Sequence, residues 1–179
     1  MLRPGVLPMT AGADSEFSGA TRATTEPSEP AIRRAKQSDL AQIQRLLTAN
    51  SLPTAGLRDS LEFFLVALQN DTVVGAIGLE PFATSALLRS AVVDESIRGT
   101  GLGTTLVHRA LALAEQMGAH NVFLLTTTAE DYFRRFGFVQ STRGAAPLTM
   151  QNSAEFRGAC PEDAIVMVRS EKSASRATQ

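Results

Sequence analysis

The sequence has little that would tie it to an oxidising compartment, a membrane or a nucleic acid. Cys160 is its one cysteine, so no intramolecular disulfide can form, and we expect a cytoplasmic protein. No apolar run approaches the ~20 residues that a bilayer span needs, so no membrane contact is predicted. The 17 lysines and arginines nearly balance the 18 acidic residues and form no block, which argues against a nucleic-acid partner. The sequence also offers no cluster of metal ligands, so we predict no metal site.

The two ends of the chain differ in composition from its middle. Residues 1–30 are rich in Ser, Thr, Ala, Gly and Pro and hold few large apolar side chains. Such a segment cannot bury enough surface to offset the entropy of ordering it. We therefore expect a disordered N-terminal tail over residues 1–30, one folded domain over residues 31–170, and a short C-terminal tail over residues 171–179.

Hydrophobic periodicity in the middle of the chain changes between the period of strands and that of helices. Ser38 is expected to cap the first helix, and Gly118 to follow the end of a longer one. A hairpin around Asn70 and Asp71, combined with alternating strands and helices, predicts an α/β fold with a mixed sheet. The expected strands cover residues 32–35, 62–69, 72–80, 85–93, 121–128 and 164–169, and the expected helices cover residues 38–50, 101–117 and 129–136.

The segment "DESIRGTGLGTTLV" follows an expected strand and has three glycines within five residues before a helix begins. The start of a helix presents unpaired N–H groups and partial positive charge, which suit a phosphate, and Arg98 adds a charged donor. A dinucleotide-binding fingerprint would need a glycine where Thr104 stands, and no Gly-Lys-Ser/Thr sequence of a P-loop is present. The remaining possibilities are an Arg-x-x-Gly-x-Gly turn that holds the pyrophosphate of coenzyme A, or a loop that only turns a corner.

The same segment resembles the acyl-CoA motif of the GNAT superfamily of N-acetyltransferases, and the resemblance extends from "AIRRAKQSDLAQIQRLL" to "DYFRRFGF". It implies the GNAT fold, a mixed and mostly antiparallel sheet flanked by helices, whose two central parallel strands splay apart around acetyl-CoA. Acetyl-CoA would be the co-substrate, and its acetyl group would pass directly to an amine. The residues that the resemblance assigns to acetyl-CoA binding are Ala91, Val92, Val93, Arg98, Gly99, Thr100, Gly101, Leu102, Gly103, Thr104 and Phe133.

Two residues are candidates for catalytic proton transfer. Glu80 stands at a strand end where this family often places the base, although a solvated strand-end glutamate is the alternative. Relatives often use a tyrosine four residues before a Gly-Phe dipeptide as the acid, but Phe133 stands there and Tyr132 comes one residue earlier. That step rotates a helical side chain by about 100°, which would turn Tyr132 away from the sulfur of the leaving group. Either Tyr132 or a water molecule would therefore be the acid.

The acceptor is expected to be held by residues outside the shared core of the fold. Arg89 interrupts an apolar strand, and its guanidinium could bind a carboxylate of the acceptor through two hydrogen bonds. An ion pair between Arg89 and Glu80 is the alternative. Arg58, Thr126 and Thr127 are the other candidates for contact with the acceptor.

The segments "SLPTAGLRD", "LLRSAVV", "LLTTTAEDYFRRFGF" and "AEFRGACPEDAIVM" together resemble the arsenic-resistance type of these acetyltransferases. Trivalent arsenic is chelated by two or three thiolates, which one cysteine cannot supply. The expected acceptor is therefore the amine of a small amino-acid-like molecule. A glutamate-type amino-acid N-acetyltransferase and a non-catalytic acyl-CoA-sensing module are the alternatives. Because relatives often dimerise through their last strands, a homodimer is a further expectation.

Overall fold

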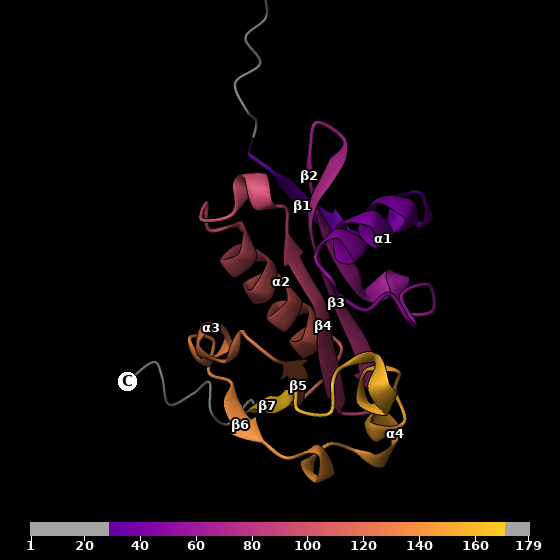
Figure 1. Ribbon diagram of the computed structural model, residues 1–179, viewed down its shortest axis with the longest axis vertical. Helices are drawn as coiled ribbons and strands as arrows, with labels where there is room; N and C mark the ends of the chain where they lie inside the picture. The colour runs from indigo at the N-terminus through magenta and orange to yellow at the C-terminus, as the bar shows by residue number, and fades with distance from the viewer. Residues whose placement is uncertain (1–28, 171–179) are drawn as a thin grey trace, which may run out of the picture.

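The computed structural model describes residues 29–170, in which seven strands form one sheet with helices on both faces (Figure 1). Residues 1–28 and 171–179, which make up most of the two expected tails, lie outside the described residues. The strands are β1 (Ala31–Arg34), β2 (Phe64–Gln69), β3 (Thr72–Phe82), β4 (Ser85–Val93), β5 (Asn121–Thr126), β6 (Val139–Ser141) and β7 (Ile165–Ser170). The helices are α1 (Leu40–Ala49), α2 (Leu102–Gln116), α3 (Glu130–Arg134) and α4 (Leu148–Gln151), and a wide helical turn spans Glu155–Ala159.

The sheet has the strand order β1-β2-β3-β4-β5-β7-β6. Only β4 and β5 run parallel, and every other neighbouring pair is antiparallel, so the expected mixed and mostly antiparallel sheet is confirmed. The parallel pairing is short, since it runs only from Ser85 opposite Asn121 to Leu87 opposite Phe123. Beyond Leu87 the two strands splay apart, and the second half of β4 has no pairing with β5.

The turn between β2 and β3 forms as the sequence predicts. Asn70 and Asp71 both have positive φ, 49° and 59°, which is the conformation of a two-residue hairpin turn. Their short polar side chains tolerate the left-handed region better than most residues do. The hairpin fixes the register of β2 on β3, with Gln69 opposite Thr72.

The start of the first helix differs from the prediction. Ser38 lies inside a 3₁₀ turn, Gln37–Asp39, and α1 begins one residue after that turn ends. Asp39 organises this corner instead, because its carboxylate accepts bonds from the backbone N–H of Lys36 at 2.7 Å and from the guanidinium of Arg33 at 2.7 and 3.0 Å. The hydrogen bonds from Arg33 and Lys36, together with the charge of Arg33, lower the pKa of Asp39, which is almost fully buried.

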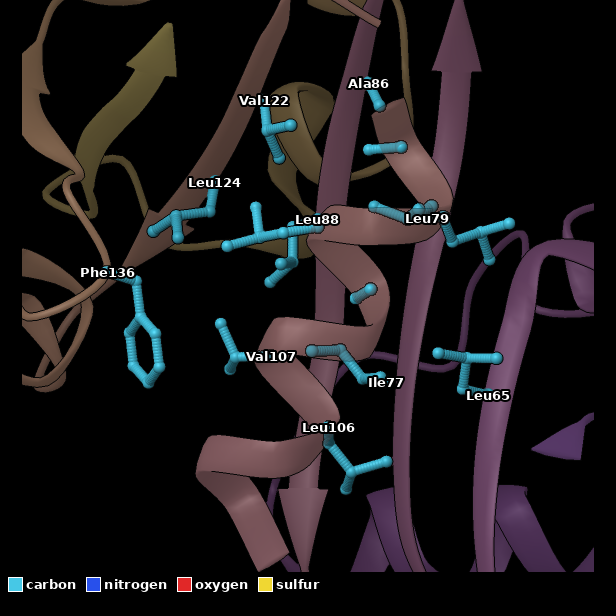
Figure 2. Packing of buried hydrophobic residues seen from close by; sticks show 14 of the residues in the cluster. Leu65, Ile77, Leu79, Ala86, Leu88, Leu106, Val107, Val122, Leu124 and Phe136 are labelled. Carbon is cyan, nitrogen blue, oxygen red and sulfur yellow. The ribbon is translucent and has the colours of Figure 1, made fainter. Parts of the chain in front are cut away.

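The core has a layer on each face of the sheet. On one face α2 packs Leu106 and Val107 over Ile77 and Leu88, as Figure 2 shows from close by. Burying each such side chain stabilises the fold by roughly 1.5–3 kcal/mol. On the opposite face the buried residues of α1 pack over Phe64, Val66, Val73, Ala76 and Val92, and α4 belongs to a smaller cluster with Leu87, Phe123, Ala146, Met150 and Val166. Within residues 29–170 no helix is long and apolar enough to cross a membrane.

Candidate functional site

A cavity of about 440 Å³ opens between the end of β4 and the first turn of α2. All the residues that the sequence assigns to acetyl-CoA binding line this cavity, except Thr100 and Phe133. The hydroxyl of Thr100 donates to the carbonyl of Ile97 at 2.9 Å and so shapes the loop from within. Phe133 is buried in the core, where its ring centroid lies 5.7 Å from that of Phe138.

Two glycines give the loop its shape. Gly99 and Gly101 have φ of +82° and +89°, a conformation that other L-residues rarely adopt. A Cβ atom on either glycine would meet no other atom within 4 Å, so backbone conformation rather than crowding requires glycine at both positions. The space beside the loop backbone is therefore open to a ligand.

The first amides of α2 make the loop attractive to an anion. The first turn of a helix leaves its N–H groups without helical partners, and here the first helical bond runs from the N–H of Thr105 to the carbonyl of Gly101 at 3.1 Å. The residues before Thr105, which are Leu102, Gly103 and Thr104, all line the cavity. The helix dipole adds partial positive charge at the same place, which favours phosphate.

A bulge in β4 turns its backbone beside the cavity. Ala76 pairs with Val92 and Gly78 pairs with Arg89, so two residues of β4 face the single residue Ile77 of β3. Ser90, inside the bulge, has a φ of +56° although it is not a glycine. Ala91 is consequently exposed in an otherwise buried stretch of strand, and it lines the cavity. The bulge lies in the part of β4 that has already separated from β5.

Arg98 fastens the loop to two other elements. Its Nε donates to the carbonyl of Val93 at 3.1 Å, and its Nη2 donates to the side-chain oxygen of Asn50 at 2.5 Å. Asn50 follows α1 directly, and its amide nitrogen donates to the carbonyl of Leu46 at 2.8 Å, which fixes the orientation of the amide group. The sequence analysis missed Asn50, because nothing in the local pattern indicates a partner 48 residues away.

Tyr132 faces the cavity from α3. Its ring makes edge-to-face contacts with Phe133 and Phe136, with centroids 5.3 and 5.2 Å apart. The guanidinium carbon of Arg135 lies 5.1 Å from the centre of the Tyr132 ring, and Arg135 also lines the cavity. Arg135 was not predicted to belong to the site, although a basic residue within one helical turn of Tyr132 was a usable signal. It adds positive charge beside the glycine loop.

Arg89 lies in a buried cluster of charged groups on the sheet face opposite α2. The ion pair with Glu80 that the sequence left open is present, with Nη1 of Arg89 3.4 Å from Oε2 of Glu80. Two further groups bind the same guanidinium: the carboxylate of Glu155 at 2.9 Å and the carbonyl of Ala55 at 2.6 Å. Arg89 and Glu155 have side chains only 2% and 5% exposed, whereas the side chain of Glu80 is 26% exposed. The sequence analysis did not single out Glu155.

The remaining acceptor candidates are not gathered in one place. The hydroxyl of Thr126 accepts the backbone N–H of Ala129 at 3.0 Å, which stabilises the turn that leads into α3. Thr127, the next residue, is exposed. Arg58 is exposed as well and lines a different surface pocket, together with the acidic residues Asp59 and Glu62.

The fold and the cavity define the class of the protein: an α/β enzyme-type scaffold whose splayed parallel strands and glycine-rich helix start are suited to a phosphate-bearing cofactor. The Acetyltransferase (GNAT) family matches residues 22–138, and the chain belongs to this family. Members of the family are acetyltransferases whose acetyl donor is acetyl-CoA, so the expected enzyme class and co-substrate are confirmed at the level of the family.

Individual relatives differ in how much of their length the chain matches. It is 32% identical over 123 residues to an amino-acid acetyltransferase of Mycobacterium tuberculosis, covering 62% of this chain and 69% of the relative. A 27% identity over 127 residues links it to the [citrate [pro-3S]-lyase] ligase of Escherichia coli, with 69% of this chain but only 34% of the relative covered. The chain therefore spans about a third of the length of that ligase.

Solved structures agree in fold. The N-acetylglutamate synthase of Neisseria gonorrhoeae, solved with coenzyme A and N-acetyl-glutamate, superposes with a TM-score of 0.69 at 19% identity, covering 81% of this chain and 36% of that one. A Mycobacterium tuberculosis protein solved with CoA gives a TM-score of 0.68 at 25% identity, covering 79% of this chain and 99% of that one. Both similarities support the GNAT fold of this chain.

Proposed function

We propose that the protein transfers the acetyl group of acetyl-CoA to the amine of a small amino-acid-like acceptor. The observation that carries this proposal is the cavity between β4 and α2, where positive-φ glycines, unpaired helix amides and a splayed strand meet. These features fit acetyl-CoA in two respects. The amides of α2 suit its pyrophosphate, and the unpaired backbone of β4 suits a chain-like ligand that carries amide groups of its own.

Two groups of residues would hold acetyl-CoA, one at its pyrophosphate and one at its thioester end. The backbone from Arg98 to Thr104 would bind the pyrophosphate, and Arg135 would add charge from the other side of the cavity. The bulged backbone near Ala91 would hold the thioester end. A backbone N–H there can polarise the thioester carbonyl, since a fixed donor stabilises negative charge as it develops on that oxygen.

Glu80 is the residue that we propose as the base. An amine attacks a carbonyl only in its neutral form, so one proton must leave it, and the partly exposed carboxylate of Glu80 would accept that proton. The C–N bond then forms while the C–S bond breaks, and the products are an acetylated amine and free coenzyme A. The acetyl thioester supplies the electrophile for this step.

Tyr132 belongs, in our proposal, with the cofactor-binding residues rather than with the acids. Its hydroxyl lies close to Gly103, at the end of the cavity proposed for the pyrophosphate. The side chain of Val93 lies beside the same position of Gly103. Ala91, where we place the thioester, comes two residues before Val93 and so lies about 7 Å along the strand from it. The leaving thiolate would therefore take its proton from water.

The acceptor class is supported by the relatives. Two amino-acid acetyltransferases match the chain at 32% identity, one from Mycobacterium tuberculosis and one from Pseudomonas putida, although over only 69% and 20% of their lengths. We therefore propose an acceptor with an α-amino acid core. An arsenic-containing amino acid is one hypothesis within this class, and glutamate is another. Arg58 and Thr127 are exposed and remain candidates for its carboxylate.

The test is release of coenzyme A from acetyl-CoA, followed with a thiol-reactive dye. The acceptor panel contains glutamate, aspartate, glutamine, phosphinothricin and an amino-acid arsenical, with inorganic arsenite as a control. The protein's own thiol gives little background, because burial and the neighbouring Glu155 carboxylate raise the pKa of Cys160 to about 12. Turnover with one amino-acid-like acceptor is the expected result.

Two variants give the assay its controls. Glu80→Gln is expected to lower kcat by about 10²-fold or more while leaving acetyl-CoA affinity unchanged. Glu115→Gln, a glutamate-to-glutamine change at an exposed residue near the C-terminal end of α2, is expected to have no effect. Tight acetyl-CoA binding without turnover on any amine would contradict the proposed reaction and favour the acyl-CoA-sensing alternative.

A further inference from the structure

The guanidinium of Arg89 lies between two carboxylates that differ in environment. Oε1 of Glu155 is 2.9 Å from Nη2, and Glu155 is nearly as buried as Arg89 itself. Oε2 of Glu80 is 3.4 Å from Nη1, and Glu80 is partly exposed to solvent. Because opposite charges attract more strongly at shorter distance and away from water, the positive charge of Arg89 is taken up mainly by Glu155.

Glu155 has both of its oxygens in use. While Oε1 pairs with Arg89, Oε2 accepts a hydrogen bond from the thiol of Cys160 at 2.7 Å. Burial and the Glu155 carboxylate raise the pKa of that thiol to about 12, so Cys160 remains a hydrogen-bond donor throughout the pH range of an enzyme assay. Each oxygen of Glu155 is thus engaged by a buried or partly buried group of the protein itself.

The same contacts join three segments that are distant in the sequence. Arg89 is on β4, Glu155 is on the wide turn before β7, and the carbonyl of Ala55 belongs to the loop after α1. Arg143 holds the turn from its other side, because its guanidinium donates to the carbonyls of Phe156 and Pro161 at 3.3 and 3.1 Å. The charged and titratable groups of this cluster in the described residues are therefore Glu80, Arg89, Arg143, Glu155 and Cys160.

We propose that Glu155 is a positioning residue for acetyl transfer: by taking up the charge of Arg89, it leaves Glu80 one weakly held oxygen and one oxygen without a partner in residues 29–170. These oxygens are then available to accept the proton of the acceptor amine. This inference rests on the proposed role of Glu80 as the base. Without Glu155, Arg89 would close onto Glu80, and a fork of two N–H donors would occupy both of its oxygens. A carboxylate bound in that way is a weaker base.

Two substitutions at position 155 separate charge from shape. Glu155→Gln keeps the size of the side chain and one acceptor oxygen, but it replaces the other oxygen with an amide nitrogen and loses the charge. Glu155→Asp keeps the charge and both oxygens and loses length. The proposal expects Glu155→Gln to lower kcat by about tenfold or more and to move the acid side of the pH–rate profile to lower pH. Glu155→Asp should keep a profile closer to that of the unsubstituted protein, and the KM for acetyl-CoA should change in neither variant.

A second buried ion pair provides the matched control. Asp39 is as buried as Glu155 and pairs with Arg33 at 2.7 Å, but it lies at the corner between β1 and α1. Asp39→Asn should lower thermal stability as Glu155→Gln does, and should leave the pH–rate profile unchanged. If both variants alter the profile equally, or if Glu155→Asp is impaired more than Glu155→Gln, Glu155 acts only through packing and the proposal is wrong.

A crystal structure of the Glu155→Gln variant tests the inference without any turnover. The guanidinium of Arg89 is expected to reach both oxygens of Glu80 within 3.0 Å, compared with the present single contact of 3.4 Å. An unchanged distance would overturn the proposal even if the enzyme is active. If instead the unsubstituted protein turns over no amine, the proposed function fails, while the crystal structure still shows whether Glu155 keeps Arg89 from closing onto Glu80.

Discussion

The hydroxyl oxygen of Tyr132 lies 2.9 Å from the point that a Cβ atom on Gly103 would occupy. The side chain of Val93 is the next nearest group, at 3.6 Å from the same point. The single tyrosine of the chain thus packs against the first turn of α2, and the absence of a side chain at residue 103 makes room for it.

This contact predicts that Gly103→Ala weakens acetyl-CoA binding through Tyr132. The new methyl group must push the hydroxyl into the cavity, and overpacking of about 1.4 kcal/mol corresponds to about tenfold in Kd. Isothermal titration should show this loss in the single variant and a much smaller one when Tyr132→Phe is present as well. Equal losses in both backgrounds would mean that the alanine acts on the backbone instead.

Tyr132→Phe alone tests whether the hydroxyl is the general acid. Its position near Gly103 predicts a kcat within about threefold of the unsubstituted enzyme, because loss of a general acid costs about 10²-fold or more. Steady-state rates at saturating acetyl-CoA provide the measurement. A fall of 10²-fold would assign the acid role to Tyr132 and place the thioester nearer to α3 than we propose.

Gly101→Val is expected to abolish acetyl-CoA binding while the protein still folds. The valine would have to adopt a φ near +89°, which costs about 1–3 kcal/mol for a residue other than glycine, and its side chain would project into open space beside the loop. Titration calorimetry and a thermal melt together check both parts. Binding of unchanged affinity would show that the pyrophosphate lies elsewhere.

Arg89→Met is expected to lower the free energy of unfolding by about 3–5 kcal/mol, because it leaves the buried carboxylate of Glu155 without its counter-charge. Arg33→Met should cost less, since the side chain of Arg33 is 35% exposed and its charge is therefore more strongly screened by water than that of Arg89. Urea denaturation of the two variants gives the comparison. A small cost at Arg89, with the acceptor KM raised far more than the acetyl-CoA KM, would instead support direct contact between Arg89 and the acceptor.

Alkaline pH should destabilise the fold through Cys160. The folded protein holds this thiol proton more tightly than the unfolded chain does, because its pKa rises from 9.0 to about 12. The resulting stability is fully present below pH 9 and is lost as the pH rises from 9 towards 12. Cys160→Ser keeps a hydroxyl donor for Glu155 that does not ionise in this range. The gap in unfolding free energy between the two proteins should therefore narrow or reverse above pH 9, and a constant gap would contradict the raised pKa.

The elements that sequence reasoning located are those whose pattern is local. The hairpin at Asn70 and Asp71 is encoded by residues that tolerate positive φ, and β4 has the predicted limits because its apolar run ends where the glycine loop begins. The rotation between Tyr132 and Phe133 also follows from helix geometry: Tyr132 faces the cavity, and Phe133 faces the core.

The elements that sequence reasoning missed depend on contacts between residues far apart in the chain. β6 has only three residues, and α4 and the turn Glu155–Ala159 are too short to show a periodic pattern. The turn is held by pairing between residues 66 positions apart, Arg89 and Glu155, and no local signal indicates such a partner. Asn50 was missed because its partner, Arg98, is also distant in the sequence. For Asp39, the contact with Arg33 was not foreseen, and Ser38 was expected at the start of the first helix instead.

The short pairing between β4 and β5 marks the boundary between an N-terminal and a C-terminal half of the sheet, and one hydrophobic core extends across it. The N-terminal half supplies the glycine loop and the start of α2, the C-terminal half supplies Tyr132 and Arg135, and only three backbone residue pairs join the two parallel strands. A ligand in the cavity would touch both halves and complete the sheet where the protein leaves it open. Coenzyme A would then connect the two halves of the sheet, and its binding would raise the melting temperature of the protein.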